Sequence, residues 1–117
     1  MKEKKTAGGN FLKIPENLCL EEEYFEALLK GRGSNFRIER IISHGHTTPP
    51  GEWYDQTSSE WVLLLQGEAT LEFEDPGEEV KIGAGDWLFI APHRRHRVIS
   101  TTSNPPCIWL AIHGDLA

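Results

Sequence analysis

The chain has 117 residues, of which 38% are hydrophobic and 26% charged, and its formal net charge at pH 7 is −6. A chain of this length buries about two-thirds of its unfolded surface, which is enough for one core without disulfides. The negative charge argues against nucleic acid as a partner, because phosphate binding needs a basic face. The longest apolar run, Trp61 to Leu65, is far below the ~20 residues of a membrane helix, so we expect no membrane partner.

The first third of the chain predicts a tail and a helix. Residues 1–10 are rich in Lys and Gly, which predicts a flexible tail before one domain over residues 11–117. The basic start lacks an apolar signal core behind it, which favours a cytoplasmic protein. Between about residues 20 and 30, acidic residues come first, Lys30 and Gly31 come last, and apolar residues recur at helical spacing. We therefore predict one short helix there, packed on the outside of a β-domain.

From about residue 36 to residue 113 the pattern changes to short apolar or alternating runs separated by turn residues. The expected strands are 36–42, 61–65, 69–74, 80–82, 87–91, 98–100 and 108–113. Short strands at close, regular intervals predict a closed antiparallel barrel or jelly roll. The predicted fold class is therefore all-β with one short N-terminal helix.

Three histidines and one glutamate carry the chemical signal. His44 and His46 are two residues apart, a spacing that places both side chains on one face of a strand. Glu60 opens the apolar run 61–65, and His96 follows the run 87–91 after a turn at Pro92. These four residues thus belong to a strand, turn, strand pattern.

The pattern resembles the two motifs of the cupin superfamily. The first is G-x5-H-x-H followed, after three or four residues, by E-x6-G, and the second is G-x5-P-x-G-x2-H-x3-N. The matching residues are, in chain order, His44, His46, Glu60, Gly67, Gly85 and His96. The resemblance covers about residues 36–113 and is strongest to small single-domain cupins with a W-Y-D-Q loop, here residues 53–56. It implies a double-stranded β-helix, or jelly-roll, barrel.

The resemblance also implies a metal centre. His44, His46, Glu60 and His96 are then expected to hold one divalent transition metal, and imidazole and carboxylate donors suit Fe, Mn, Ni, Cu or Zn. The sequence does not choose among these metals. Gln56, four residues before Glu60, is an alternative ligand through its amide oxygen. No residue is assigned a catalytic role.

Thirteen residues separate His46 from Glu60, which predicts a loop long enough to act as a lid or binding element. Alternatively, the aromatic residues of this loop, Trp53 and Tyr54, pack over the open end of the barrel. Arg94 belongs to an Arg-rich turn beside His96, which either binds an anionic ligand or offsets nearby acidic residues. His93 supports a ligand histidine or is exposed, and the position of His113 stays open. The candidate substrate-pocket residues are Trp53, Tyr54, Gln56, Arg40, His93 and Arg94.

Strand alternation assigns the faces. If His44 and His46 point inward, Arg40 on the same strand points inward as well. If Glu60 points inward, then Trp61, Leu63 and Leu65 point outward. An apolar outer face needs a cover, either the predicted helix or a second subunit, so we expect a homodimer.

Two classes of function follow from the resemblance and the site. The first is a metal-dependent enzyme, such as an oxygenase, isomerase or lyase, acting on a small metabolite with a preference for an anionic one. The second is a non-catalytic module that binds or senses a small molecule and uses its metal structurally.

Overall fold

The computed structural model describes residues 6–33 and 35–117, and within them it contains eight β-strands and no helix. The strands are β1 Tyr24–Lys30, β2 Arg37–Ser43, β3 Ser59–Gln66, β4 Glu68–Phe73, β5 Glu78–Gly83, β6 Trp87–Ile90, β7 His96–Thr101 and β8 Cys107–Gly114. The all-β jelly roll predicted from the sequence is confirmed. Nothing in these described ranges is a helix that could span a membrane. The predicted tail lies partly outside the described residues, and residues 6–10 are exposed.

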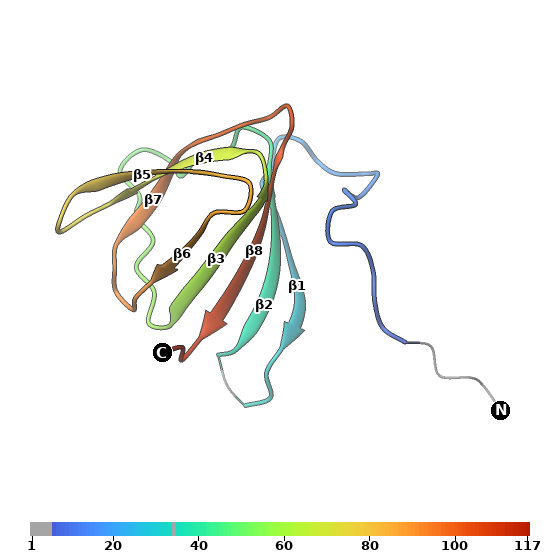
Figure 1. Ribbon diagram of the computed structural model, residues 1–117, viewed down its shortest axis with the longest axis horizontal. Helices are drawn as coiled ribbons and strands as arrows, with labels where there is room; N and C mark the ends of the chain where they lie inside the picture. Colours follow the sequence, from blue (N-terminus) through green and yellow to red (C-terminus); the bar gives the residue numbers. More distant parts are fainter. Residues whose placement is uncertain (1–5, 34) are drawn as a thin grey trace.

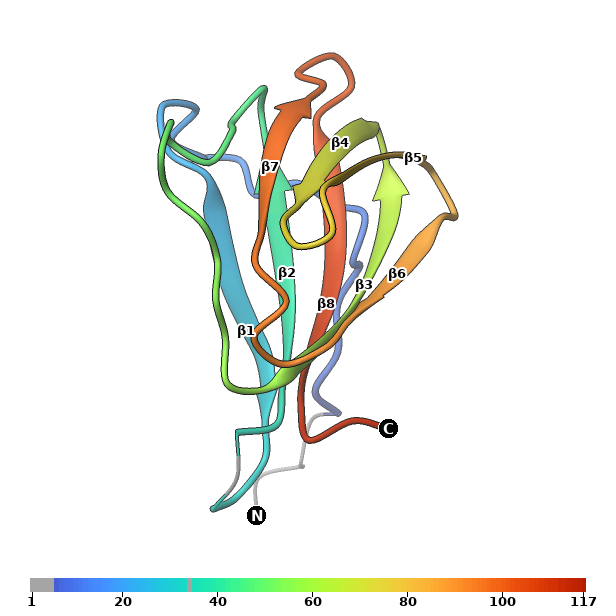
Figure 2. The ribbon, with the colours of Figure 1, turned by 90° about the vertical axis from the view of Figure 1, so that its left-hand side faces the viewer.

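The strands form two antiparallel sheets that enclose the core. One sheet has the order β1-β2-β8-β3-β6 and the other has the order β5-β4-β7. Figures 1 and 2 show the smaller sheet folded over one end of the larger one, with the two layers facing each other. The chain passes from β3 to β4 through Gly67, whose φ is 91°. A Cβ there would meet Cys107 Sγ and Thr102 Oγ1 at 2.8 Å, so only glycine fits this turn.

The core lies between the sheets and is built from alternate residues of each strand. Strands β3 and β4 alone contribute two or three buried apolar residues each, spaced two apart along the chain. The cluster is Val62, Leu64, Ala69, Leu71, Phe73, Ile82, Ile90, Cys107 and Trp109. Burial of each large apolar side chain contributes about 1.5–3 kcal/mol, so this cluster holds the two sheets together.

The helix predicted over residues 20–30 is wrong, because residues 24–30 form strand β1. Tyr24 lies opposite Ile42 and Lys30 opposite Arg37, with a register shift between Ala27 and Leu29. The helix preference of Glu, Ala, Leu and Lys amounts to only a few tenths of a kcal/mol per residue. Pairing with the free edge of β2 satisfies the backbone and therefore overrides that preference.

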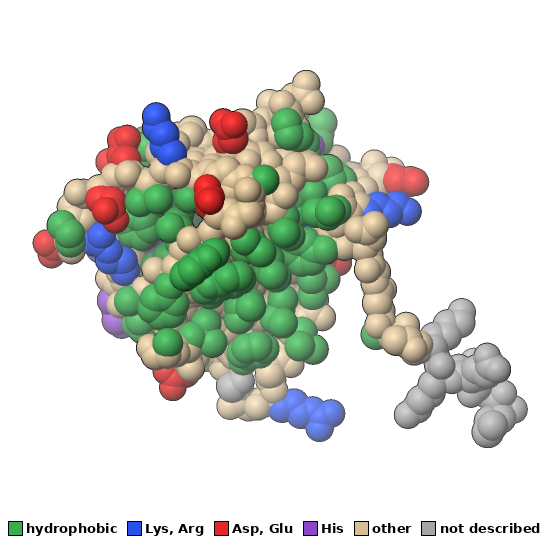
Figure 3. Space-filling view, in the orientation of Figure 1, with side chains coloured by type: hydrophobic (Ala, Val, Ile, Leu, Met, Phe, Trp, Pro, Cys, Tyr) green, Lys and Arg blue, Asp and Glu red, His purple; other side chains and the backbone are tan. Residues whose placement is uncertain are grey.

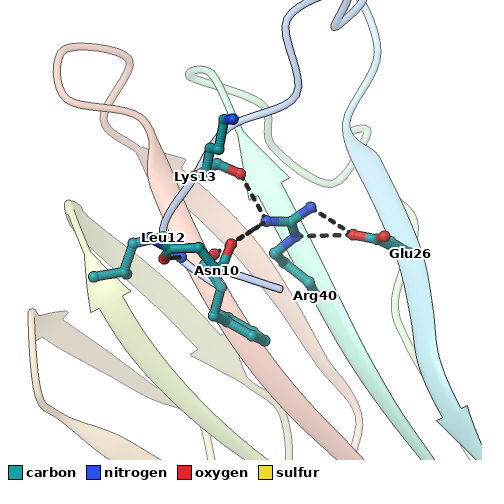
Figure 4. Close-up of polar contacts among 6 residues, drawn as sticks. Asn10, Leu12, Lys13, Glu26 and Arg40 are labelled. Atoms are coloured by element: carbon teal, nitrogen blue, oxygen red, sulfur yellow. Dashed lines mark hydrogen bonds and ion pairs between the residues drawn. The ribbon is translucent and has the colours of Figure 1, made fainter. Parts of the chain in front are cut away.

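The outer face of the larger sheet carries a buried arginine that holds the N-terminal segment in place (Figure 4). The Arg40 guanidinium donates hydrogen bonds to the carbonyl oxygens of Asn10, Phe11 and Lys13, at 3.4, 3.1 and 2.8 Å. It also pairs with the Glu26 carboxylate at 2.6 Å. Arg40 is only 7% exposed, so its charge is neutralised and its donors are used within the fold.

Candidate ligand-binding pocket

A cavity of about 160 Å³ lies between the two sheets. Strand alternation explains its walls, since residues two apart on β2, β3 and β7 face it together. Its polar lining consists of Glu23, Arg37, Glu39, Tyr54, Gln56, Glu60, His96 and His113. Its apolar lining consists of Phe25, Ile41, Val62, Leu71, Ile90, Val98 and Trp109. Phe25 and Tyr54 are 51% and 38% exposed, which places the mouth of the cavity beside them.

Carboxylates and imidazoles alternate along the pocket wall. His113 Nε2 lies 3.3 Å from Glu39 Oε1 and 3.6 Å from Glu60 Oε2. On the other side of the same carboxylate, His96 Nε2 lies 3.7 Å from Glu60 Oε1. The sheet register produces this arrangement, because Glu60 is opposite His113 across β3 and β8, whereas His96 comes from the smaller sheet.

Burial and the neighbouring imidazoles shift the pKa values of the two glutamates in opposite directions. Burial raises the pKa of Glu60, and the neighbouring imidazoles of His113 and His96 oppose that rise only in part. The pKa of Glu39 is lowered, first by the hydrogen bond with His113, while burial opposes this and Arg37 adds to it. Glu60 is therefore a weakly stabilised buried carboxylate, and Glu39 a well stabilised one.

The loop between β2 and β3 contributes a third wall. Tyr54 and His96 pair through their backbones, with N–H to oxygen distances of 2.8 and 3.1 Å, and their rings stack with centroids 5.5 Å apart. The His93 N–H donates to the Gln56 carbonyl at 2.7 Å. Tyr54 and Gln56, two residues apart, line the cavity, so the W-Y-D-Q loop behaves as an extra strand at the mouth. Burial, followed by nearby carboxylates, raises the pKa of Tyr54, which keeps the phenol protonated.

The structure brings together two of the four predicted metal ligands. Glu60 and His96 meet in the cavity, but His44 and His46 do not line it. Strand β2 ends at Ser43, and beyond it Gly45 takes a φ of 76°. The His44 N–H then donates to His46 Nδ1 at 2.9 Å, so that ring nitrogen is engaged within the turn.

The cupin resemblance implies a divalent metal, and the predicted donors do not fit one here. Over residues 6–33 and 35–117, no group of three or more His, Cys, Asp or Glu side chains is placed to hold a metal ion. The two imidazoles expected from the H-x-H pair lie outside the cavity that holds Glu60 and His96. We therefore derive no chemical step through a metal.

The motif spacing contained a signal that the sequence reasoning missed. In the first cupin motif, three or four residues separate H-x-H from the glutamate. A gap of three residues before Glu60 places Tyr54 and Gln56, rather than His44 and His46, at the two histidine positions. The cupin motifs point to neither Glu39 nor His113, which both line the cavity, although alternation within their strands predicts that they share a face with Ile41 and Trp109 respectively.

The arginine-rich turn is engaged outside the cavity. Arg94 donates to the carbonyl oxygens of Glu74 and Pro76 and lies 5.0 Å over the Phe73 ring. Arg95 pairs with Glu74 at 2.9 Å, and Arg97 pairs with Glu72 at 2.7 Å. Arg95 and Arg97 thus offset acidic side chains, whereas Arg94 binds backbone carbonyls and does not line the pocket.

The remaining pocket candidates also lie elsewhere. Trp53 is covered by Arg95 and Arg97, whose guanidinium carbons are 5.5 and 5.1 Å from its ring. His93 Nδ1 is 2.8 Å from the Asp55 carboxylate in an exposed pair. Arg40 points to the outer face, where it binds the N-terminal segment. Among the candidates drawn from the loop and its neighbours, Tyr54 and Gln56 are the ones that face the cavity.

Comparisons with known proteins assign the family. The family model described as the cupin domain matches residues 38–113, so the chain belongs to the cupin domain family. A solved structure from Ralstonia eutropha JMP134, whose name provisionally assigns it as a mannose-6-phosphate isomerase, is 39% identical. The alignment covers 95% of this chain and 100% of that one, with a TM-score of 0.84.

More distant solved structures share the fold. A cupin superfamily protein from Desulfitobacterium hafniense DCB-2 is 19% identical with a TM-score of 0.66, covering 88% of this chain and 83% of that one. A polyketide cyclase from Streptomyces resistomycificus is 18% identical with a TM-score of 0.65, covering 82% and 67%. A comparison with curated proteins found no match.

Proposed function

We propose that this cupin binds a small organic molecule in the cavity between its sheets, with Glu60, Tyr54 and Gln56 as the recognition groups. The observation that carries the proposal is their unused hydrogen-bonding capacity. The side-chain partners of Glu60 are imidazole nitrogens at 3.6 and 3.7 Å, beyond hydrogen-bonding distance. Within residues 6–33 and 35–117, the side chains of Tyr54 and Gln56 have no hydrogen-bond partner.

An unsatisfied buried carboxylate is costly, so its position needs a reason. A buried polar group without a hydrogen bond costs about 1–3 kcal/mol, and a buried charge costs more. Glu60 is 8% exposed and adjoins an apolar wall that includes Val62, Ile90 and Val98. Concave apolar sites with a few convergent polar groups are the usual form of small-molecule sites, and a ligand donor would satisfy the carboxylate.

Reducing the cavity tests the proposal. Fragments detected by ligand-observed NMR with wild-type protein should be lost in Val98→Phe, because the larger side chain occupies part of the cavity. Ile99→Phe, at the next residue and off the cavity lining, should retain them. Melting followed by circular dichroism confirms that both variants fold, since overpacking costs about 1–3 kcal/mol. Fragments that bind equally to all three proteins would place binding elsewhere.

A metal-dependent reaction, which the family resemblance implies, stays a prediction. Its support is that Glu60 and His96, the donors that match both cupin motifs, meet at 3.7 Å. Elemental analysis of anaerobically purified wild type beside His46→Ala and Glu60→Gln distinguishes the two functions. Binding without a metal predicts less than one tenth of an equivalent of any transition metal, whereas a metal enzyme predicts stoichiometric metal that is lost in Glu60→Gln.

We also propose that a second copy of the chain covers the outer face of the larger sheet. Figure 3, in the orientation of Figure 1, shows a broad apolar patch over this sheet. Strand register places Phe89, Trp61, Ile112 and Ile38 in one row across β6, β3, β8 and β2. Trp87 and Phe89 are 58% and 42% exposed. The predicted covering helix is instead strand β1, and Arg40 holds the N-terminal segment beside β1 and β2, at the opposite edge of the sheet from β6. A second subunit is therefore the expected cover for Trp87 and Phe89.

A further inference from the structure

The size of the cavity limits the ligand. Its volume is about 160 Å³, comparable with the ~150 Å³ engineered cavity that takes up benzene, whereas sites for drug-sized ligands measure about 300–1,000 Å³. The enclosed part of a ligand is thus the size of one six-membered ring with a short substituent. A sugar phosphate is too large to be enclosed here.

The charge of the cavity limits the ligand further. Three carboxylates line it, those of Glu23, Glu39 and Glu60, against one guanidinium, that of Arg37. The Arg37 side chain is 38% exposed and its Nε lies 3.8 Å from Glu39, so its charge is largely offset at the rim. The other arginines near the turn at residues 94–97 are paired on the outer surface. An anionic ligand would therefore meet like charge in a poorly solvated space.

One acceptor in this acidic wall is free to bind a ligand. Glu23 accepts a hydrogen bond from the Ser43 hydroxyl, and Glu39 is bonded to His113. Among residues 6–33 and 35–117, no side chain lies within hydrogen-bonding distance of the Glu60 carboxylate, which is more than nine-tenths buried, and the buried Nδ1 of the adjacent His113 has no partner. The unfilled capacity is thus centred on one carboxylate at the apolar wall.

We propose, on the basis of the function above, that the cavity selects a protonated primary amine carried on a compact apolar body. An ammonium group supplies the positive counter-charge and the hydrogen-bond donor that the Glu60 carboxylate lacks. Its further N–H groups can donate to the oxygen atoms of Tyr54 and Gln56, which line the same cavity. The apolar body fills the space beside Val62, Val98 and Trp109. This ligand class is opposite in charge to the anionic metabolite suggested by the arginine-rich turn.

Three probes of nearly equal size and different charge test the proposal: benzylamine, benzyl alcohol and benzoate. We expect calorimetric titration at pH 7 to give benzylamine a dissociation constant at least about tenfold lower than that of benzyl alcohol, with benzoate weakest, because a charge-assisted hydrogen bond is about twice as strong as a neutral one. In Glu60→Gln the amine and alcohol should bind within about twofold of each other. Glu74→Gln, which alters an exposed carboxylate paired with Arg95, should keep the preference.

Several outcomes would overturn the amine proposal. These are equal binding of amine and alcohol to wild type, tighter binding of benzoate, an amine preference that survives Glu60→Gln, or amine binding that survives Val98→Phe. Alcohol binding that Val98→Phe abolishes, without an amine preference, would reject the amine class while upholding the cavity as a ligand site. Absence of binding by all three probes also rejects the amine class, and the fragment experiment above then decides the broader function.

Discussion

Arg40 is buried on the outer face of the larger sheet and Glu60 on its inner face, and the two charges differ in how well they are paired. On the outer face, Arg40 pairs with Glu26 and donates to three backbone carbonyls, so its charge and donors are used. On the inner face, the Glu60 carboxylate lies 3.6 and 3.7 Å from its nearest imidazoles, and no side chain in the described part of the chain is hydrogen-bonded to it. A satisfied buried charge fixes the structure, whereas an unsatisfied one beside a cavity indicates a binding site.

The largest effect is expected on the outer face from Trp87→Glu. A carboxylate at this exposed apolar position would be buried by a second subunit, so the dimer dissociation constant should rise at least about 100-fold, which corresponds to about 2.7 kcal/mol. Sedimentation velocity measures it, with Ser100→Glu on the smaller sheet as the matched control. A wild-type protein that stays monomeric at high concentration would remove the outer face as an interface.

The next largest effect is expected from removing the buried charge of the outer face. Arg40→Met should lower the free energy of unfolding by about 2–3 kcal/mol, because it leaves Glu26 and three carbonyl groups without their donor. Arg37→Met, at a half-exposed position on the inner face, should change it by no more than about 0.5 kcal/mol. Urea unfolding gives both values, and equal losses in the two variants would contradict a structural role specific to Arg40.

On the inner face, Glu60→Gln should leave the fold intact or stabilise it. Burial raises the pKa of Glu60, so at pH 8 its charged form is a cost that the isosteric amide avoids, and we expect a gain of up to about 1 kcal/mol. Glu74→Gln on the surface should fall within about 0.5 kcal/mol of wild type. A loss above 1 kcal/mol in Glu60→Gln at pH 8 would indicate that the carboxylate is structural after all.

The smallest effect is expected from Arg94→Gln. Its guanidinium is bonded to backbone carbonyls outside the cavity, so fragment affinity in the NMR assay should stay within about twofold of wild type. A tenfold loss of affinity would return the arginine-rich turn to the binding site.

The sequence predicts most of the strands but only part of the pocket lining. Strands β2 to β8 follow apolar alternation bounded by turn residues, which is a local signal. The identity of β1 depends on a long-range edge pairing that no local pattern contains. An inward Arg40 depends on the premise that His44 and His46 point inward, but strand β2 ends at Ser43 and neither histidine lines the cavity. Alternation within β2 places Glu39 and Ile41 on the cavity side and therefore Arg40 on the outer face. Glu60 and His96 both line the cavity, and each adjoins a strand that the sequence defines.

The indole N–H signals of the tryptophans in a ¹H–¹⁵N NMR spectrum test the central claim most directly. Trp109 lines the cavity and donates its indole N–H to Ser43, whereas Trp61 and Trp87 stack on the outer face, with ring centroids 5.9 Å apart. Titration with a fragment should shift the Trp109 signal and leave those of Trp61 and Trp87 in place. A shift of the Trp61 and Trp87 signals with Trp109 unchanged would put the ligand on the outer face and contradict a binding site between the sheets.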